Sequence, residues 1–337
     1  MKRVGFLIEQ IADMDNLRLA FYKAQRGKNE KIEVLAYRAL LETHLMALRA
    51  QLLKGEVNVG SYRLFKIFDP KERIVCAAAF SERVLHHAIL NICEPYFERH
   101  MITTTYANRT GKGVYKALEK AFVSTNHHAY VAKLDVRKYF DSVDHHVLQN
   151  QLMHLFKDKL LLGILSKIIA SYHVESGKGL PIGNLTSQYF ANYYLSILDH
   201  YAKEELHVPV YIRYMDDILI YGNDRAQLTK QVKAIITYAK EHLALTMKNP
   251  IIQTTHQGIN FLGYHLRTHV IGVARRSRVR FEHKLKVIME AYKKEKLTEQ
   301  ELQSHTIPLF AFAGHAYTKN YKKKVMEKVA SRLDLTA

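Results

Sequence analysis

Apolar side chains recur three and four positions apart along much of this chain, which is the spacing of one helix face. The clearest such stretch runs from 34 to 53 and ends at Gly55. Residues 269–337 are also expected to be mostly helical. Further helices are predicted at about 81–92 (ending before Pro95), at 114–123 and at 184–205. Two more have a candidate N-cap: Ser142 for the helix that carries Val147 to Phe156, and Asp224 for the helix at 226–243.

Shorter apolar runs between these helices predict strands. Two of them, 210–214 and 218–221, are hinged at Asp216 and Asp217, which indicates a hairpin. The other predicted strands are 62–67 and 74–78 around an Asp69-Pro70 turn, 129–135, 259–265 and 270–273. Helices beside a small antiparallel sheet predict an α+β fold.

Composition excludes several classes of protein. The chain has 337 residues, enough for a large core and two or three subdomains. Its longest apolar runs, such as 75–80, are too short to span a membrane. The first apolar stretch is broken at Glu9 and Asp13, unlike a signal peptide. Neither of the two cysteines belongs to a C-x-x-C pair, which argues against structural zinc and a disulfide framework. A cytoplasmic location is the default expectation.

The chain is strongly basic, with a formal net charge of +18. Two interpretations are open: a merely basic soluble protein, or one that binds a polyanion. The distribution favours the second, because bases cluster near the C-terminal end and would follow a phosphate backbone. These bases are Arg275, Arg276, Arg278 and Arg280, then Lys293, Lys294 and Lys296, then Lys322 to Lys324.

Three aspartates stand out as candidate chemistry. Asp135 ends an apolar strand, and Asp216 and Asp217 occupy the predicted hairpin tip. A single aspartate at a turn is often structural, because it hydrogen-bonds its own backbone. Two adjacent acids between strands without other acids repel each other, and a bound cation removes that penalty. Carboxylate oxygens suit Mg²⁺, and two such ions can activate an attacking hydroxyl and stabilise a leaving oxygen.

Tyr214-Met215-Asp216-Asp217 resembles the Y-x-D-D signature of reverse transcriptases, and further motifs follow the same order. The matching segments are 69–75 and 106–113 (fingers motifs), Leu134 to Asp141 (motif A), Gly179 to Gln188 (motif B) and Asn260 to Tyr264 (primer grip). The resemblance covers roughly residues 60–270 and implies a right-hand polymerase of fingers, palm and thumb. It implies an N-terminal extension and fingers at 1–128, a palm at 129–268 with a helical fingers insertion at about 148–178, and a basic helical thumb at 269–337.

The resemblance also implies roles for individual residues. Asp135, Asp216 and Asp217 would hold two Mg²⁺ ions, with Mn²⁺ as a substitute, and the carbonyl of Val136 would also contact metal. The incoming triphosphate would meet Lys71, Arg73 and Arg109, although the first two also fit a solvated hairpin edge. Template and primer would contact Gln188, Tyr214, Met215, Leu262, Gly263, Arg276 and Arg278.

Two further residues refine the resemblance. Phe140 lies where reverse transcriptases place an aromatic ring that excludes a 2′-hydroxyl, and the alternative is a core phenylalanine beside Tyr139. Ile182 stands in motif B where many reverse transcriptases have glutamine, and the I-G-N-L-T-S-Q form is similar to diversity-generating retroelement enzymes. Without that amide, checking of the nascent pair would depend on shape, so Ile182 also belongs to the predicted dNTP site.

The subclass implies error-prone copying of a template-repeat RNA at adenines, from a bacterial or phage-encoded enzyme. Its implied partners are the RNA template, a cDNA or primer, dNTPs and a small basic accessory variability protein, with no membrane. The alternatives are a retron or group II intron-like reverse transcriptase, or a catalytically silent RNA-binding protein on a polymerase scaffold.

Overall fold

The computed structural model describes residues 3–68, 72–316 and 319–332, and it confirms the α+β class. The chain forms two compact units. The first comprises residues 1–109, 135–207 and 233–248, and the second comprises 110–134, 208–232 and 249–337. Each unit is therefore assembled from three separate stretches of sequence, and one of the divisions falls between Leu134 and Asp135.

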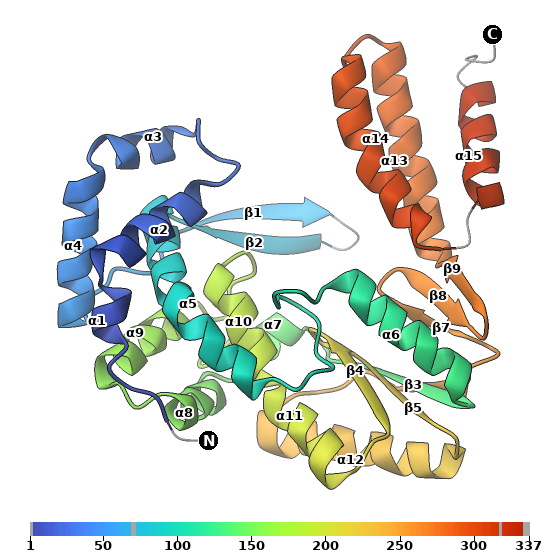
Figure 1. Cartoon of the computed structure of the whole chain (residues 1–337), viewed down its shortest axis with the longest axis horizontal. Helices are drawn as coiled ribbons and strands as arrows, with labels where there is room; N and C mark the ends of the chain where they lie inside the picture. The colour runs from blue at the N-terminus through green and yellow to red at the C-terminus, as the bar shows by residue number, and fades with distance from the viewer. Residues whose placement is uncertain (1–2, 69–71, 317–318, 333–337) are drawn as a thin grey trace. The chain divides into compact units, whose positions relative to one another are not determined.

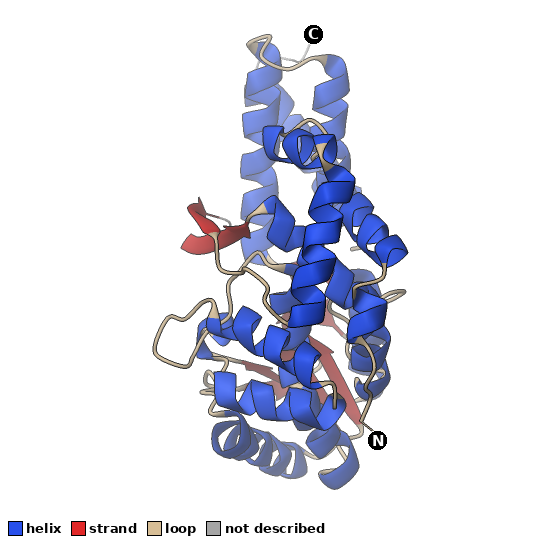
Figure 2. Ribbon diagram, turned by 90° about the vertical axis from the view of Figure 1, so that its left-hand side faces the viewer, coloured by secondary structure: helices blue, strands red, loops and turns tan. Residues whose placement is uncertain are grey.

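The first unit begins with helices that pack around α5 (Figure 1). Asn16 is buried and donates to the carbonyls of Ile11 and Ala88, which ties the N-terminal helices to α5. A single antiparallel hairpin, β1–β2, is the red ribbon that stands apart from the helices in Figure 2. The elements are α1 (Ile8–Ile11), α2 (Met14–Gln25), α3 (Ile32–Ala39), α4 (Leu41–Lys54), β1 (Tyr62–Phe68), β2 (Glu72–Ala78) and α5 (Phe80–His100).

Helix α5 corrects the expectation that the helix would end before Pro95. It runs through Pro95 to His100. Proline removes one main-chain hydrogen bond and disfavours a helix interior. The compensation is tertiary: Phe97 is buried and packs against the rings of Phe156 and Tyr193, with centroids 5.7 and 5.2 Å away.

The rest of the first unit is helical, and it corrects a second expectation. Ser142 does not cap the helix that follows it. It is the last residue of a short helix, α7, and its hydroxyl donates to the carbonyls of Arg137 and Lys138. Asp144 is the actual cap, accepting from the amide of Val147. The elements are α7 (Tyr139–Ser142), α8 (His145–Leu155), α9 (Lys159–Ala170), α10 (Leu185–Tyr194), α11 (Ser196–His200) and a π-helix (Tyr201–Glu205).

The second unit contains a four-stranded sheet in the order β4-β5-β3-β6, which helix α6 covers. Tyr221 of β5 is fully buried and donates to the carbonyl of Ala121 in α6. The predicted hairpin is confirmed, whereas β6 was not expected from the sequence. The elements are α6 (Val114–His127), β3 (Tyr130–Asp135), β4 (Val210–Tyr214), β5 (Asp217–Gly222) and β6 (Ile251–Thr254). Helix α12 (Arg225–Leu243) follows, with Asp224 accepting from the amide of Ala226 as expected of its cap.

The C-terminal part of the second unit is a three-stranded antiparallel sheet followed by three helices (Figure 1). A small core of Phe281, Leu285, Ala313 and Val325 holds the helices together. The helical expectation for this basic region is confirmed. The elements are β7 (Ile259–Phe261), β8 (Tyr264–Arg267), β9 (Val270–Val273), α13 (Arg275–Lys293), α14 (Glu299–Gly314) and α15 (Lys319–Arg332).

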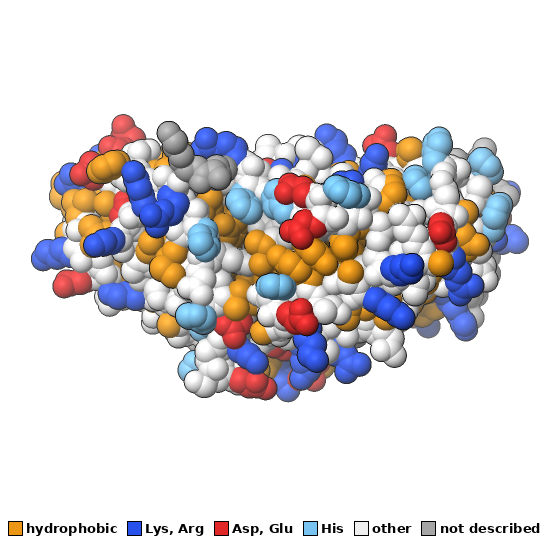
Figure 3. All heavy atoms as spheres, turned by 90° about the horizontal axis from the view of Figure 1, so that it is seen from below, with side chains coloured by type: hydrophobic (Ala, Val, Ile, Leu, Met, Phe, Trp, Pro, Cys, Tyr) orange, Lys and Arg blue, Asp and Glu red, His pale blue; other side chains and the backbone are white. Residues whose placement is uncertain are grey.

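Surface charge and hydropathy give two further observations. On the face drawn in Figure 3, lysine and arginine side chains are interspersed with acidic and histidine side chains around a central area of hydrophobic ones. The excess of positive charge is therefore not one patch on that face, and its role must be sought in particular sites. In the part of the chain that the structure describes, no helix is long and apolar enough to cross a membrane.

Candidate functional site

The β4–β5 hairpin presents its two aspartates on a short turn. Tyr214 pairs with Asp217, so Met215 and Asp216 alone form the connection. Met215 has a φ of +54°, as such tight turns require. Arg213, fully buried, donates from Nη1 to the carbonyl of Met215 over 3.0 Å. The central residues of both strands are buried, so the turn stands on a rigid support.

Lys133 contacts one of these carboxylates and was not anticipated from the sequence. Its Nζ lies 2.8 Å from Oδ1 of Asp217 and also donates to the carbonyl of Asn260 over 3.0 Å. Both side chains of the ion pair are largely buried, 19% and 23% exposed, so solvent screens the pair less than it would a surface pair. A lysine inside the apolar strand 131–134 was the signal in the sequence that could have found it.

A cavity of about 710 Å³ in the second unit joins the hairpin tip to the predicted primer grip. Asp217, Leu262, Gly263 and Arg276 all line it, so the structure brings these four predicted residues together. Leu262 and Gly263 form a two-residue turn between β7 and β8, with φ of +50° and +88°. A Cβ on Gly263 would lie 3.1 Å from both Phe312 and Ser277, so glycine allows the helices to pack closely on this turn.

Asp135 belongs to the first unit and has a lysine of its own. It is the last residue of β3, with its side chain 32% exposed. The ammonium group of Lys248 pairs with its Oδ1, and the amide of Lys248 donates to its carbonyl over 2.8 Å. Val136 is buried and bridges Met247 through its main chain. No sequence pattern pointed to Lys248, which lies 113 positions from Asp135 in the chain.

Main-chain hydrogen bonds in the first unit join motif A, motif B and the β1–β2 hairpin. The amide of Leu180 donates to the carbonyl of Phe140 over 2.8 Å, and that of Cys76 donates to the carbonyl of Ile182 over 2.7 Å. Gly183 has a φ of +115°, and a Cβ there would lie 2.8 Å from Val75 Cγ1 and 3.0 Å from the carbonyl oxygen of Cys76. Phe140 and Ile182 themselves are half-buried. The motif B loop and β2 are therefore in direct contact.

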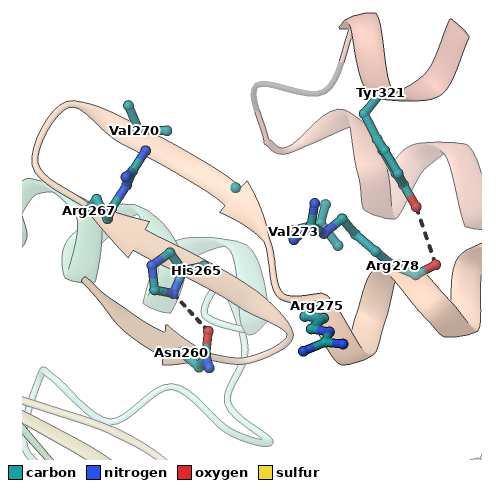
Figure 4. Close-up of a pocket in the computed structure, with 9 residues that line it drawn as sticks. Asn260, His265, Arg267, Val270, Val273, Arg275, Arg278 and Tyr321 are labelled. Carbon is teal, nitrogen blue, oxygen red and sulfur yellow. Dashed lines mark hydrogen bonds between the residues drawn. The ribbon is translucent and has the colours of Figure 1, made fainter. Parts of the chain in front are cut away.

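The other predicted residues occupy varied positions. Arg73 is exposed on β2, whereas Lys71 lies outside the described residues. Arg109 is only 8% exposed and donates to Glu98, Ile102 and Thr105, so in this structure it holds a loop together. Its triphosphate contact stays a prediction, as does that of the exposed Arg73. Gln188 is half-buried on α10. Arg278 lines a cavity (Figure 4) other than the one that Asp217 lines. Burial raises the pKa of Tyr214.

The donor chemistry fits a hard divalent cation. Asp135 and Asp217 offer carboxylates on side chains that are 32% and 23% exposed, and Asp216 lies half-buried at the turn. Carboxylates of this kind are the ligands that Mg²⁺ takes in protein sites. Among residues 3–68, 72–316 and 319–332, no three His, Cys, Asp or Glu side chains are grouped within reach of one ion. A shared metal centre is therefore a proposal and not an observation.

Comparison with known proteins identifies the family. The family model described as reverse transcriptase (RNA-dependent DNA polymerase) matches residues 68–266. The chain is 23% identical over 308 residues to Protein YkfC of Escherichia coli K12, covering 77% of this chain and 80% of that protein. It is 26% identical over 113 residues to Nuclear intron maturase 1, mitochondrial, of Arabidopsis thaliana, covering 34% of this chain. It is also 21% identical over 275 residues to Putative COX1/OXI3 intron 2 protein of Saccharomyces cerevisiae, covering 62%.

The match covers 80% of the Escherichia coli protein, but only 15% of the Arabidopsis protein and 31% of the yeast protein. The family model matches one continuous stretch, residues 68–266. It covers more than half of this chain and includes the motif A strand, the motif B loop, the β4–β5 hairpin and the primer-grip turn. The protein therefore belongs to the reverse transcriptase family and is an RNA-directed DNA polymerase, a nucleotidyltransferase.

Proposed function

We propose that this protein is a diversity-generating retroelement reverse transcriptase, which copies a template-repeat RNA into cDNA with errors at template adenines. A reverse transcriptase implies an RNA template, a primer and dNTPs. The observation that carries the subclass is the motif B loop, in which Ile182 precedes the crowded Gly183. The small basic accessory variability protein belongs to the same proposal.

The right-hand arrangement belongs to the proposal as well. Fingers would extend from the N-terminal helices through residue 128, the palm from 129 to 268, and the thumb from 269 onward. Supporting this, the predicted dNTP residues that the structure describes lie in the first unit, and the predicted primer residues Leu262, Gly263 and Arg276 lie in the second. Under this proposal, each of these two groups of predicted contact residues lies within one compact unit.

The chemistry would be nucleotidyl transfer at Asp135, Asp216 and Asp217, with the carbonyl of Val136 beside them. These residues would hold two Mg²⁺ ions. When bound, the ions would activate the primer hydroxyl and neutralise charge on the leaving pyrophosphate. The protein supplies positioning.

The surrounding residues have positioning tasks of their own. Lys133 and Lys248 hold Asp217 and Asp135 in place through their ion pairs. Arg73 would grip the triphosphate with its planar guanidinium. Phe140, whose carbonyl is fixed by Leu180, would exclude the 2′-hydroxyl of a ribonucleotide.

Error-prone copying follows from what Ile182 lacks. The carbonyl of Ile182 accepts from the amide of Cys76 in β2, which restrains the main chain at this position. An isoleucine offers shape but no hydrogen bond, and a hydrogen-bonding site rejects wrong partners more strongly than an apolar one. The nascent pair opposite adenine would therefore be checked less strictly.

The test is primer extension on a defined RNA template, with the cDNA sequenced. Ile182→Gln is expected to lower misincorporation opposite adenine about fivefold, the equivalent of one hydrogen bond of about 1 kcal/mol. Ile182→Leu keeps an apolar side chain and serves as the matched control, with an unchanged spectrum. An Ile182→Gln enzyme with the wild-type adenine errors would refute the role of this residue.

A second candidate is an intron-type reverse transcriptase. The observation favouring it is the similarity to an intron maturase and to an intron-encoded yeast protein. The same sequencing experiment separates the two. Errors concentrated at template adenines support the diversity-generating subclass, whereas a low and even error rate at all four template bases supports the intron type.

A further inference from the structure

A lysine joins the tip of the β4–β5 hairpin to the strand before the predicted primer-grip turn. Nζ of Lys133 lies 2.8 Å from Oδ1 of Asp217 and 3.1 Å from its Oδ2, so the ammonium group contacts both carboxylate oxygens. Oδ1 is itself buried. The same ammonium group donates to the main-chain carbonyl of Asn260 in β7 over 3.0 Å. All three residues belong to the second unit. The carboxylate of Asp217 is therefore already bound to a cation of the protein itself.

The cavity beside this pair has an excess of positive charge. Of the described residues that line it, Asp217 is the sole acid, whereas Lys133, Arg275, Arg276 and Arg280 are bases. These bases repel any further cation that approaches Asp217, and the repulsion is stronger where little water screens it. Binding of a divalent ion at Asp217 must therefore overcome both this repulsion and the loss of the ion pair with Lys133.

Lys133 has a second acceptor that does not depend on the carboxylate. The carbonyl of Asn260 belongs to a strand that pairs with β8, so the main chain holds it in place. A largely buried charge that loses every partner is strongly destabilised. Because the Asn260 carbonyl remains, the ammonium group can leave Asp217 and still keep a hydrogen bond. Lys133 is therefore suited to exchange with another cation at Asp217.

We propose that Lys133 is an internal competitor of the divalent metal at Asp217. Its ammonium group neutralises the carboxylate in the metal-free protein and leaves it when Asp217 binds an ion. This rests on the proposed function, in which Asp217 is a metal carboxylate. Lys133 thereby stabilises the metal-free hairpin, in which Asp216 and Asp217 would otherwise repel each other, and it lowers the affinity of the site for metal.

A purely structural lysine would give an effect of the opposite sign. If Lys133 only held Asp217 in a favourable position, its removal would loosen the carboxylate and weaken metal binding. If Lys133 competes with the metal, its removal strengthens metal binding, because the ion no longer displaces a charge-assisted hydrogen bond. The direction of the change in metal affinity therefore decides between the two roles.

The first experiment measures Mn²⁺ binding to the full chain by electron paramagnetic resonance, without nucleotide or nucleic acid. Lys133→Met removes the charge and keeps an unbranched side chain. It is expected to bind Mn²⁺ about tenfold more tightly than the wild type, which corresponds to about 1.4 kcal/mol for a hydrogen bond to a charged group. Lys230→Met is the matched control, because it removes one charge from an exposed position of the same unit that does not line this cavity. Unchanged or weaker Mn²⁺ binding by Lys133→Met overturns the proposal.

Two aspartate substitutions separate this inference from the proposed function. Under the proposed function, Asp216→Asn and Asp217→Asn each weaken Mn²⁺ binding, and adding Lys133→Met to Asp217→Asn restores none of it. If neither aspartate substitution changes Mn²⁺ binding, the hairpin is not a metal site and both proposals fail. If both weaken it and Lys133→Met does not strengthen it, the competition fails and the metal site stands.

Chemical labelling of the wild-type protein tests the exchange without any substitution, and so without a risk of misfolding. An amine that leaves an ion pair reacts more readily with an acetylating reagent. Saturating Mg²⁺ is therefore expected to increase acetylation of Lys133, measured by mass spectrometry, whereas the exposed Lys230 should react equally with and without Mg²⁺. Acetylation of Lys133 that Mg²⁺ leaves unchanged would show that the ammonium group stays on Asp217, and the proposal would be overturned.

Discussion

Two hairpins of this chain have the same topology and opposite surroundings. In β4–β5 the central residues are buried and two residues close the turn. In β1–β2 most side chains are exposed, including Leu64 at 60% and Phe68 at 72%. A two-stranded hairpin is marginally stable by itself in water. The buried hairpin takes its rigidity from the core, whereas the exposed one depends on contacts at its base.

Those basal contacts are few and specific. The Tyr62 hydroxyl lies 2.6 Å from that of Ser171, and the amide of Cys76 donates to Ile182. The comparison shows a division of tasks. The buried hairpin holds the candidate catalytic aspartates on a buried support, and the exposed hairpin presents apolar and basic side chains such as Phe65 and Arg73 at the surface. Substitutions in each hairpin test that division.

The largest expected effect is at the tip of the buried hairpin. Asp216→Asn removes one carboxylate charge from the candidate metal site, and a loss of several kcal/mol in transition-state stabilisation corresponds to about 10³-fold slower primer extension. Single-turnover extension on an RNA template measures this. Asp15→Asn, at a side chain 92% exposed, is the control and should extend normally. Extension by Asp216→Asn at the wild-type rate would contradict the two-metal proposal.

The next effect concerns stability and uses the same substitution in both hairpins. Ile220 in β5 is fully buried, whereas Ile74 in β2 is 48% exposed. Ile220→Ala is expected to lower the free energy of unfolding by about 2–5 kcal/mol because it leaves a cavity. Ile74→Ala is expected to change it by no more than about 0.5 kcal/mol. Urea unfolding of both variants measures the difference, and equal losses would remove the contrast between the hairpins.

A smaller effect is expected at the base of the exposed hairpin. Gly183→Ala forces a Cβ against Val75 and Cys76 and strains a positive φ. We expect a stability loss of about 2–4 kcal/mol from crowding and strain together, and a higher KM for dNTP as β2 shifts. Gly177→Ala in the same loop has positive φ but open space around it, so it should cost only about 1 kcal/mol. Similar costs at both positions would show that contact with β2 is unimportant.

The smallest effect is a pH dependence beside the same base. Burial, with the charge of His87 adding to it, lowers the pKa of His86 to about 3. Its neighbour Glu82 accepts from the amide of Gly60, just before β1, and burial raises the pKa of Glu82. The folded state keeps His86 neutral while the unfolded chain takes up a proton below its ordinary pKa of about 6.5. Stability from His86 is therefore present above that pH and is lost as the pH falls toward 3.

Between pH 7 and pH 5 this loss amounts to about 2 kcal/mol for one buried histidine. Glu82 acts in the opposite direction, because its protonated form is favoured in the folded state and its contribution to stability falls as the pH rises through its raised pKa. Urea unfolding at both pH values is the measurement. His86→Leu should flatten the acid side of the profile, Glu82→Gln should steepen it, and an unchanged slope in His86→Leu would show that His86 does not titrate in this range.

Local sequence determined much of this protein. Two short apolar runs on either side of Asp216 and Asp217 predicted the β4–β5 hairpin, Asp224 capped its helix as expected, and motif order indicated the family. These succeed because hairpins, caps and motifs depend on neighbours within a few residues. The predictions failed where distant packing overrides local preference. Pro95 sits inside a helix because Phe97 finds partners from two other segments, and Ser142 loses its capping role to Asp144.

Only the tertiary structure decided what surrounds the candidate site. The ion pair between Asp135 and Lys248 joins residues 113 positions apart, and that between Lys133 and Asp217 joins residues 84 apart. No local pattern encodes such pairings, because side-chain proximity across the chain is created by the packing of whole elements. The sequence determined which groups are candidates for the chemistry, and the fold decided which other groups form ion pairs with them.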